Sequence, residues 1–219
     1  MNVMLDLETL GTKPGSVVLS IGAVEFDKDG VYREFYKEID VASSKGWGLT
    51  VDDSTLEWWA KQSPEARATF DRCHANDVEV AGLGPVLIEF TAWMHFCKGG
   101  IEKLKLWGNG SDFDNVLLDA AYRAANLAYP IKYWNHRCFR SLKGLPMVNG
   151  KALEPKRHGT HHNALDDAKH QAHWAIGILT ELYAGQAAAV QLGRDAIPRK
   201  NAEPAVAAGY AWPFPTNAK

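Results

Sequence analysis

The sequence predicts an α/β or α+β domain with one mixed sheet flanked by helices. Two observations predict this class: three strand-like segments follow one another near the N-terminus, and helical segments then surround one further strand-like segment. Consecutive strands followed by helices around a later strand are typical of a mixed sheet with helices on its faces.

The strands are predicted from composition and from one turn. Residues 3–8 are short and apolar-rich, residues 17–26 are rich in branched side chains, and residues 31–39 alternate between apolar and polar. The turn Asp27-Lys28-Asp29-Gly30 predicts that the second and third strands form a hairpin. A fourth strand is predicted over 103–107.

The helices are predicted from caps and from periodicity. Ser54 is expected to cap a short helix, and Ser63 a second one that has Pro64 at its first position. Further helices are predicted over 85–98, 112–127 and about 162–186, with a less regular stretch over 133–160.

Length and composition indicate a globular chain. The 219 residues are 46% hydrophobic and 23% charged, which is ordinary for one folded domain. We expect a domain over 1–190 and a Pro/Ala-rich C-terminal tail over 191–219, docked on the domain or on a partner.

Several classes of protein are excluded by simple counts. No uncharged apolar run is long enough for a membrane span, and the N-terminus lacks a basic signal-peptide region, so a cytoplasmic location is expected. The three cysteines are odd in number and form no C-x-x-C pair, which argues against a disulfide scaffold and a cysteine zinc site. A net charge of −2 means that nucleic-acid binding would need a local basic patch or bound cations.

The first candidate motif is Asp6-Leu7-Glu8 on the first predicted strand. Side chains at i and i+2 share one face of a strand, so both carboxylates project together. Such a pair repels unless a cation neutralises it, and oxygen ligands favour Mg²⁺ or Mn²⁺. Solvent-facing acids paired with Lys or Arg are the alternative.

The second candidate motif is Asp112-Phe113-Asp114, which opens a predicted helix after the fourth strand. Acidic residues in a first helical turn are also favoured by the helix dipole, so a capping role for either Asp is the alternative.

The third candidate motif runs from His161 to Ala168 at the start of the last helix. His162 before the helix and Asp167 one turn inside it can face one site together. Two other interpretations stay open: His162, Asp166 and His170 can line one helix face and bind zinc, or all are solvated polar residues.

Together, D-x-E, F-D and H-x-A-x-x-D in this order resemble the DEDD superfamily of 3′→5′ exonucleases, in its histidine-containing branch. That branch includes RNase T, oligoribonuclease and the proofreading exonucleases of replicative polymerases. The resemblance spans about residues 3–185. A further likeness, in STLEWW at 54–59 and QSPEA at 62–66, is to a subgroup with phage exonucleases and a mycobacterial exoribonuclease.

The second motif departs from the family pattern by one extra residue after Asn109. The F-D-x-x-L continuation formed by Phe113, Asp114 and Leu117 aligns only with Asp114, which is therefore the expected ligand, with Asp112 as the fallback.

The resemblance implies a ribonuclease H-like fold and two Mg²⁺ or Mn²⁺ ions held by four carboxylates. By analogy Asp6 bridges both metals, Glu8 and Asp167 complete the first site, and Asp114 serves the second. His162, in its neutral form, would be the general base. The implied reaction is stepwise hydrolysis of single-stranded nucleic acid from a free 3′ end, which releases nucleoside monophosphates.

A basic segment precedes the third motif, with Glu154 as its one acid between Arg137 and His158. We predict that Lys156 and Arg157 contact phosphates, the alternative being a solvated loop.

Two further segments are candidates for substrate contact. Trp58 and Trp59 diverge by about 100° on a helix, so one can pack in the core while the other, Trp58 in this interpretation, stacks on a base; structural roles for both are the alternative. The segment Thr9-Leu10-Gly11 touches the terminal nucleotide in relatives, and we expect the same contact.

Two other functions remain open from the sequence. One is a catalytically silent nucleic-acid-binding module of the same fold. The other is a zinc hydrolase built from His158, His161, His162, His170 and His173. The sequence does not discriminate DNA from RNA, and both a monomer and a homodimer are compatible with it.

Overall fold

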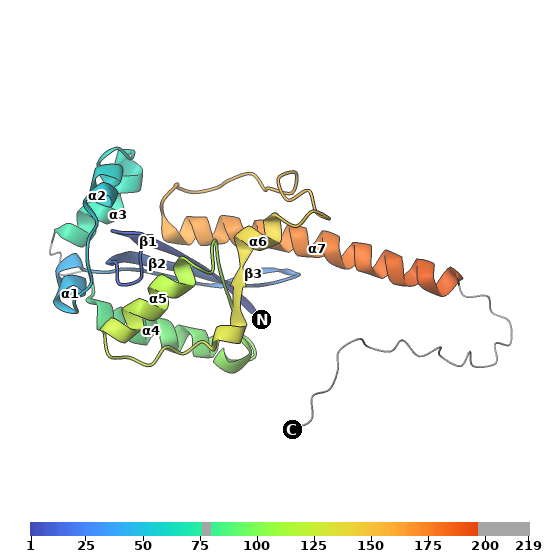
Figure 1. The fold of residues 1–219 in the computed structure, drawn as a ribbon, viewed down its shortest axis with the longest axis horizontal. Coiled ribbons are helices and arrows are strands. Elements are labelled where there is room, and N and C mark those ends of the chain that lie inside the picture. Colours follow the sequence, from blue (N-terminus) through green and yellow to red (C-terminus); the bar gives the residue numbers. More distant parts are fainter. Residues whose placement is uncertain (76–79, 197–219) are drawn as a thin grey trace, which may run out of the picture. The chain divides into compact units, whose positions relative to one another are not determined.

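A computed structural model describes residues 1–75 and 80–196 of the chain. Its five strands form one sheet in the order β3-β2-β1-β4-β5 (Figure 1). The strands are β1 (Asn2–Thr9), β2 (Val18–Asp27), β3 (Gly30–Glu38), β4 (Lys105–Gly108) and β5 (His136–Cys138). The first three are antiparallel, and β4 and β5 then add in parallel to β1, so the predicted mixed sheet is confirmed.

Seven α-helices and two short 3₁₀ turns connect and cover the strands in the described part of the chain. The helices are α1 (Val41–Gly46), α2 (Asp53–Ala60), α3 (Pro64–His74), α4 (Leu83–Phe96), α5 (Asp114–Ala124), α6 (Phe139–Lys143) and α7 (Ala164–Ala196). The 3₁₀ turns are η1 (Ile101–Lys103) and η2 (Tyr133–Asn135). No helix among the described residues is long and apolar enough to cross a membrane.

The chain divides into a compact unit over Met1–Leu182 and a second unit over Tyr183–Lys219. Within the second unit the structure describes the end of α7, up to Ala196. From residue 197 onward, the predicted Pro/Ala-rich tail lies outside the described residues.

The two faces of the sheet carry separate hydrophobic clusters. Helices α4 and α5 cover one face and pack on the odd-numbered side chains of β1, such as Val3 and Leu5 (Figure 1). Helices α6 and α7 cover the other face, where Met4 of β1 joins Phe139 and Ala172. Since alternate side chains of a strand point to opposite faces, Asp6 and Glu8 lie on the α7 side with Met4.

Five sequence-based expectations differ from the structure. Strand β5 and helices α1 and α6 were not predicted, because three, six and five residues are too short to show a period. Helix α2 is preceded by Asp52, not capped by Ser54, and α7 continues ten residues beyond the expected end at 186. The start of α3 is confirmed: Ser63 accepts a hydrogen bond from the backbone of Ala66, and Pro64 follows it.

The start of α7 is held against the sheet at Gly22. Gly22 lies opposite Asp6 in the β1–β2 ladder, and a Cβ atom at Gly22 would overlap with the backbone of Ala164 and Leu165. Only a glycine allows this approach, so the local sequence of β2 decides how near the third motif comes to the first.

Candidate active site

Strand β1 carries Asp6 and Glu8 past the point where β4 stops pairing with it. The β1–β4 ladder ends at Met4 and Trp107, and β1 continues to Thr9. Glu8 is buried and lies at a register shift in the β1–β2 ladder. The backbone of β1 beyond Met4 is thereby open to groups other than a neighbouring strand.

Asp114 fills the space that β4 leaves. It is the first residue of α5 and is 3% exposed. Backbone N–H groups of Leu7 and Asn109 donate hydrogen bonds to its carboxylate. A Cβ atom at Gly108 would collide with Asp114, so the glycine that ends β4 permits this placement. The fallback residue, Asp112, is exposed and does not line the cavity that Asp114 lines.

A loop over residues 157–163 is fastened to the first turn of α7. The Asn163 side chain accepts hydrogen bonds from the backbone of Leu165 and Asp166, in the manner of an N-cap. The Asp166 carboxylate accepts a hydrogen bond from the backbone N–H of Thr160, so it stabilises the loop. This is a local structural role for Asp166.

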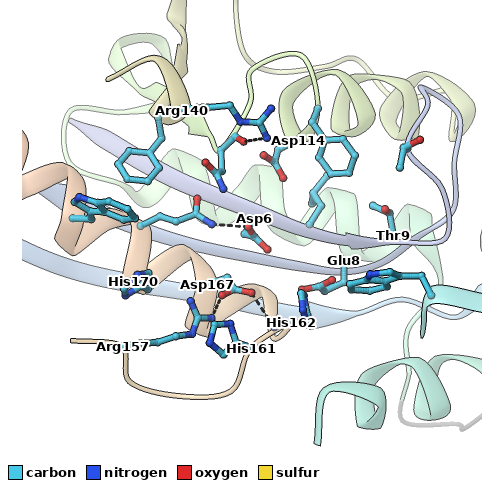
Figure 2. A pocket seen from close by; sticks show the side chains of 18 of the residues that line it. Asp6, Glu8, Thr9, Asp114, Arg140, Arg157, His161, His162, Asp167 and His170 are labelled. Carbon is cyan, nitrogen blue, oxygen red and sulfur yellow. Dashed lines mark hydrogen bonds and ion pairs between the residues drawn. The ribbon is translucent and has the colours of Figure 1, made fainter. Parts of the chain in front are cut away.

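His162 and Asp167 come together at the end of this loop. The His162 backbone N–H donates to the Asp167 carboxylate over 3.0 Å, and the Arg157 guanidinium also donates to that carboxylate (Figure 2). The backbone of His162 is left-handed, with φ of 62°. Non-glycine residues adopt this conformation uncommonly, and histidine is among those that tolerate it.

One contact at the site had not been predicted. The Gln171 side chain, one helical turn after Asp167, donates a hydrogen bond to Asp6 over 2.8 Å. Spacing of i and i+4 places Gln171 on the same face of α7 as Asp167, and this is the signal from which the contact was predictable.

These residues line a single cavity of about 680 Å³ (Figure 2). The predicted catalytic residues all line it, together with three of the predicted substrate-binding residues. The catalytic residues are Asp6, Glu8, Asp114, His162 and Asp167, and the others are Thr9, Trp58 and Arg157. Leu10 is fully buried in the core, and neither it nor Gly11 nor the exposed Lys156 lines the cavity. Two more cations from the basic segment, Arg140 and Lys143, do line it.

The two adjacent tryptophans have different environments. Trp59 is 1% exposed, and its indole N–H donates to the carbonyl of Thr9 over 3.0 Å. Trp58 is 41% exposed, and its ring meets the His162 ring edge-on with centroids 4.8 Å apart. Trp59 therefore fastens α2 to the end of β1, whereas Trp58 presents a face to the cavity.

Residues 1–179 match the model of one protein family, the 3′-5′ exoribonuclease Rv2179c-like domain. The chain belongs to this family. It is a 3′-5′ exonuclease, and its fold is the ribonuclease H-like fold that the motifs implied.

Known proteins similar to this exonuclease agree with that assignment. The chain is 26% identical, over 180 residues, to the exodeoxyribonuclease of Enterobacteria phage T4, covering 72% of this chain and 77% of the phage protein. The solved nuclease domain of 3′hExo, a DEDDh family member bound to rAMP, has 16% identity and a TM-score of 0.54, covering 82% and 92% of the two chains. Exonuclease X with 5′ overhanging duplex DNA has 15% identity and a TM-score of 0.52, covering 83% and 92%.

Burial dominates the electrostatics of the exonuclease site. It raises the pKa of Glu8 to about 8 and that of Asp114 to about 7, and it raises the pKa of Asp6 well above its ordinary value. Asp114 and Glu8 also raise the pKa of Asp6, and Asp114 raises that of Glu8, because like charges close together resist ionisation. The protein alone therefore does not stabilise the fully ionised cluster.

The donor set of the exonuclease fits divalent cations. Glu8, His162 and Asp167 offer ligand atoms within 4.8 Å of one another, and Asp6 and Asp114 line the same cavity. Carboxylate oxygens suit Mg²⁺ and Mn²⁺, and a cation would neutralise the repulsion. The five histidines of the zinc alternative do not form such a group among the described residues.

Proposed function

We propose that this exonuclease hydrolyses single-stranded nucleic acid from a free 3′ end, with two divalent cations and a histidine general base, and releases nucleoside monophosphates. The observation that carries the proposal is the convergence of Asp6, Glu8, Asp114, Asp167 and His162 on one cavity, although they come from β1, α5, α7 and the loop before α7.

The four carboxylates are the proposed ligands. When bound, the cations supply the positive charge that activates a water molecule and stabilises the leaving 3′ oxygen. The role of the protein is to present the carboxylates in fixed positions: Asp6 is held by Gln171, Asp114 by backbone N–H groups, and Asp167 by the backbone of His162.

His162 is proposed to accept the proton of the attacking water. A general base must be unprotonated, and burial lowers the pKa of His162, with His161 and Arg157 lowering it further. The perpendicular contact with the Trp58 ring and the left-handed backbone limit the orientations open to the imidazole.

The terminal nucleoside is proposed to occupy the end of the cavity near Thr9 and Trp58. The exposed face of Trp58 suits stacking on a base, a contact worth about 1–3 kcal/mol. Arg157, which pairs with Asp167, is proposed to contact the phosphate being cleaved. The proposal covers both RNA and DNA, because the matching family model is described as an exoribonuclease and the phage relative as an exodeoxyribonuclease.

A degradation time course tests the proposal. Two 5′-labelled single strands of the same sequence, one RNA and one DNA, are incubated with Mg²⁺, with Mn²⁺ or with EDTA. The expected result is stepwise shortening that requires metal, is lost in Asp6→Asn and Asp114→Asn, and persists in Asp112→Asn. The last variant is a matched control, since Asp112 is two residues from Asp114 but exposed.

The same experiment addresses the alternative of a silent binding module. Binding of either strand without any shortening would support that alternative and contradict the proposed reaction. The strand that is shortened at the higher rate would identify the preferred substrate.

A further inference from the structure

The cavity continues beyond the carboxylates to an end between α6 and α7. Its wall there includes Phe139, Arg140, Lys143, His170 and Trp174. Arg140 and His170 lie on the opposite side of Asp6 from Thr9 in Figure 2. This region, termed the α6–α7 end, has no part in the reaction described above.

Lys143 occupies a defined position at the α6–α7 end. Its ammonium nitrogen lies 5.1 Å from the ring centre of Phe139 and 5.0 Å from that of Trp174, within the range of cation–π contacts. Both rings are themselves held in place: Phe139 is fully buried, and the Trp174 indole N–H donates to the Gly150 carbonyl over 2.6 Å. The two rings therefore form a fixed aromatic surface against which the ammonium group packs.

The cations of this end interact with nearby acids through longer-range electrostatics: the charge of Glu154 acts on Lys143, and that of Arg140 acts on Asp114. Among the residues that the structure describes, neither Arg140 nor Lys143 forms an ion pair; the Arg140 guanidinium donates to the carbonyl of Asn109 over 2.8 Å. Glu154 also lines the cavity, but its carboxylate contacts Lys151 and lies 3.6 Å from His170. Burial and the neighbouring Arg140 lower the pKa of Lys143, and the smaller opposing effect of Glu154 does not offset them.

The opposite end of the cavity has a different chemistry. The wall there is formed by Thr9 at the end of β1, Thr12 just after it, and Ser54, Thr55 and the two tryptophans of α2. None of these three segments contributes a lysine or arginine to the wall. A 3′-terminal nucleoside carries hydroxyl groups and a base, and no phosphate beyond the one being cleaved. The rest of the strand carries one phosphate per nucleotide. The uncharged end therefore suits the nucleoside, and the cationic end suits the continuing strand.

We propose that Lys143, with Arg140 beside it, forms a subsite for the phosphodiester immediately upstream of the scissile one. The inference rests on the proposed exonuclease function. It predicts that a trinucleotide, which has an upstream phosphodiester, uses Lys143, whereas a dinucleotide, which has only the scissile one, does not reach it.

The test compares a 5′-hydroxyl dinucleotide with the trinucleotide that extends it by one residue. Lys143→Met removes the charge but keeps an unbranched chain over Phe139 and Trp174, and Lys143→Arg keeps the charge. We expect Lys143→Met to lower kcat/KM for the trinucleotide roughly tenfold, in line with the loss of one charge-assisted contact, and to leave the dinucleotide within about twofold. Lys143→Arg should retain most of the trinucleotide rate.

Lys132→Ala is the control for loss of one positive charge, because Lys132 is exposed and does not line the cavity. It should behave as the wild type on both substrates. Equal losses on the two substrates in Lys143→Met would mean that Lys143 only supports the cavity wall, and would overturn the subsite.

Binding separates this inference from the proposed function. If the wild type cleaves neither substrate, the exonuclease proposal fails. The subsite is then tested by the affinity for the trinucleotide, measured by tryptophan fluorescence in EDTA. Weaker trinucleotide binding by Lys143→Met than by the wild type supports it. Equal affinities, or no trinucleotide binding by the wild type, overturn it.

Discussion

The Gln171 carboxamide donates a hydrogen bond to the Asp6 carboxylate over 2.8 Å, which joins α7 to β1 at the centre of the carboxylate cluster. Gln171 is 7% exposed, and its amide oxygen has no hydrogen-bond partner among the described residues. This bond lowers the pKa of Asp6 against the larger effect of burial. Gln171 thus favours the ionised form of Asp6 and fixes its orientation.

Gln171→Leu should therefore weaken metal binding. We expect the Mg²⁺ concentration for half-maximal activity to rise about 10–100-fold, as is usual when a partner of a metal ligand is removed. Titration of activity with Mg²⁺ measures the change. Gln186→Leu, at an exposed position of the same helix, is the matched control. An unchanged Mg²⁺ requirement in Gln171→Leu would show that Asp6 is positioned without it.

The stability of the metal-free protein should fall as pH rises. The folded-state pKa of Asp114 is about 7 and that of Glu8 about 8, both above their ordinary values of 3.8 and 4.5. The folded state therefore binds more protons than the unfolded state between these limits, so the contribution to stability is complete below about pH 4 and is lost as pH rises through 7 to 8. Each group removes up to about 1.4 kcal/mol per pH unit from the free energy of unfolding.

Thermal unfolding in EDTA across this pH range measures the effect. Glu8→Gln should flatten the dependence, because the amide does not ionise, and excess Mg²⁺ should reverse it by neutralising the carboxylates. A metal-free protein that becomes more stable from about pH 5 to about pH 8 would contradict the raised pKa values.

Gly22→Ala should both destabilise the fold and reduce activity. The added Cβ overlaps with the backbone of Ala164 and Leu165, so α7 must shift and carry Asp167 away from Asp6. We expect a loss of about 1–3 kcal/mol in the free energy of unfolding, as for other overpacked positions, measured by urea denaturation. Gly84→Ala is the control: this helical position of α4 has open space and should gain about 0.5–1 kcal/mol. Wild-type stability in Gly22→Ala would mean that the close approach is not required.

The rate at saturating Mg²⁺ should fall as pH drops through the pKa of His162. Burial places this pKa below the ordinary 6.5, so the imidazole is neutral at pH 7 and the acid limb lies below about 6.5. His162→Asn should lower kcat by about 10²–10⁴-fold, the usual contribution of a general base. His173→Asn, on an exposed part of α7, should leave the profile unchanged. Retention of the acid limb in His162→Asn would assign it to another group.

The sequence by itself determined the features that depend on local periodicity. A period of two on β1 placed Asp6 and Glu8 on one face. The capping pattern of Ser63 and Pro64 located the start of α3, and the resemblance of Phe113, Asp114 and Leu117 to the family motif singled out Asp114, the buried acid of that motif. Each of these inferences involves residues that are close together in the sequence, within one strand or one helical turn.

Only the tertiary structure decided which distant groups meet. The basic segment shows no local difference among its lysines and arginines, but in the structure Arg140, Lys143 and Arg157 line the cavity and Lys156 does not. The tertiary structure also separated Trp58 from Trp59, and it brought Gln171 to Asp6 across 165 positions of sequence. The physical reason is that propensity and periodicity set the direction of a side chain relative to its own element, whereas close approaches such as that of Ala164 to Gly22 set the distance between elements.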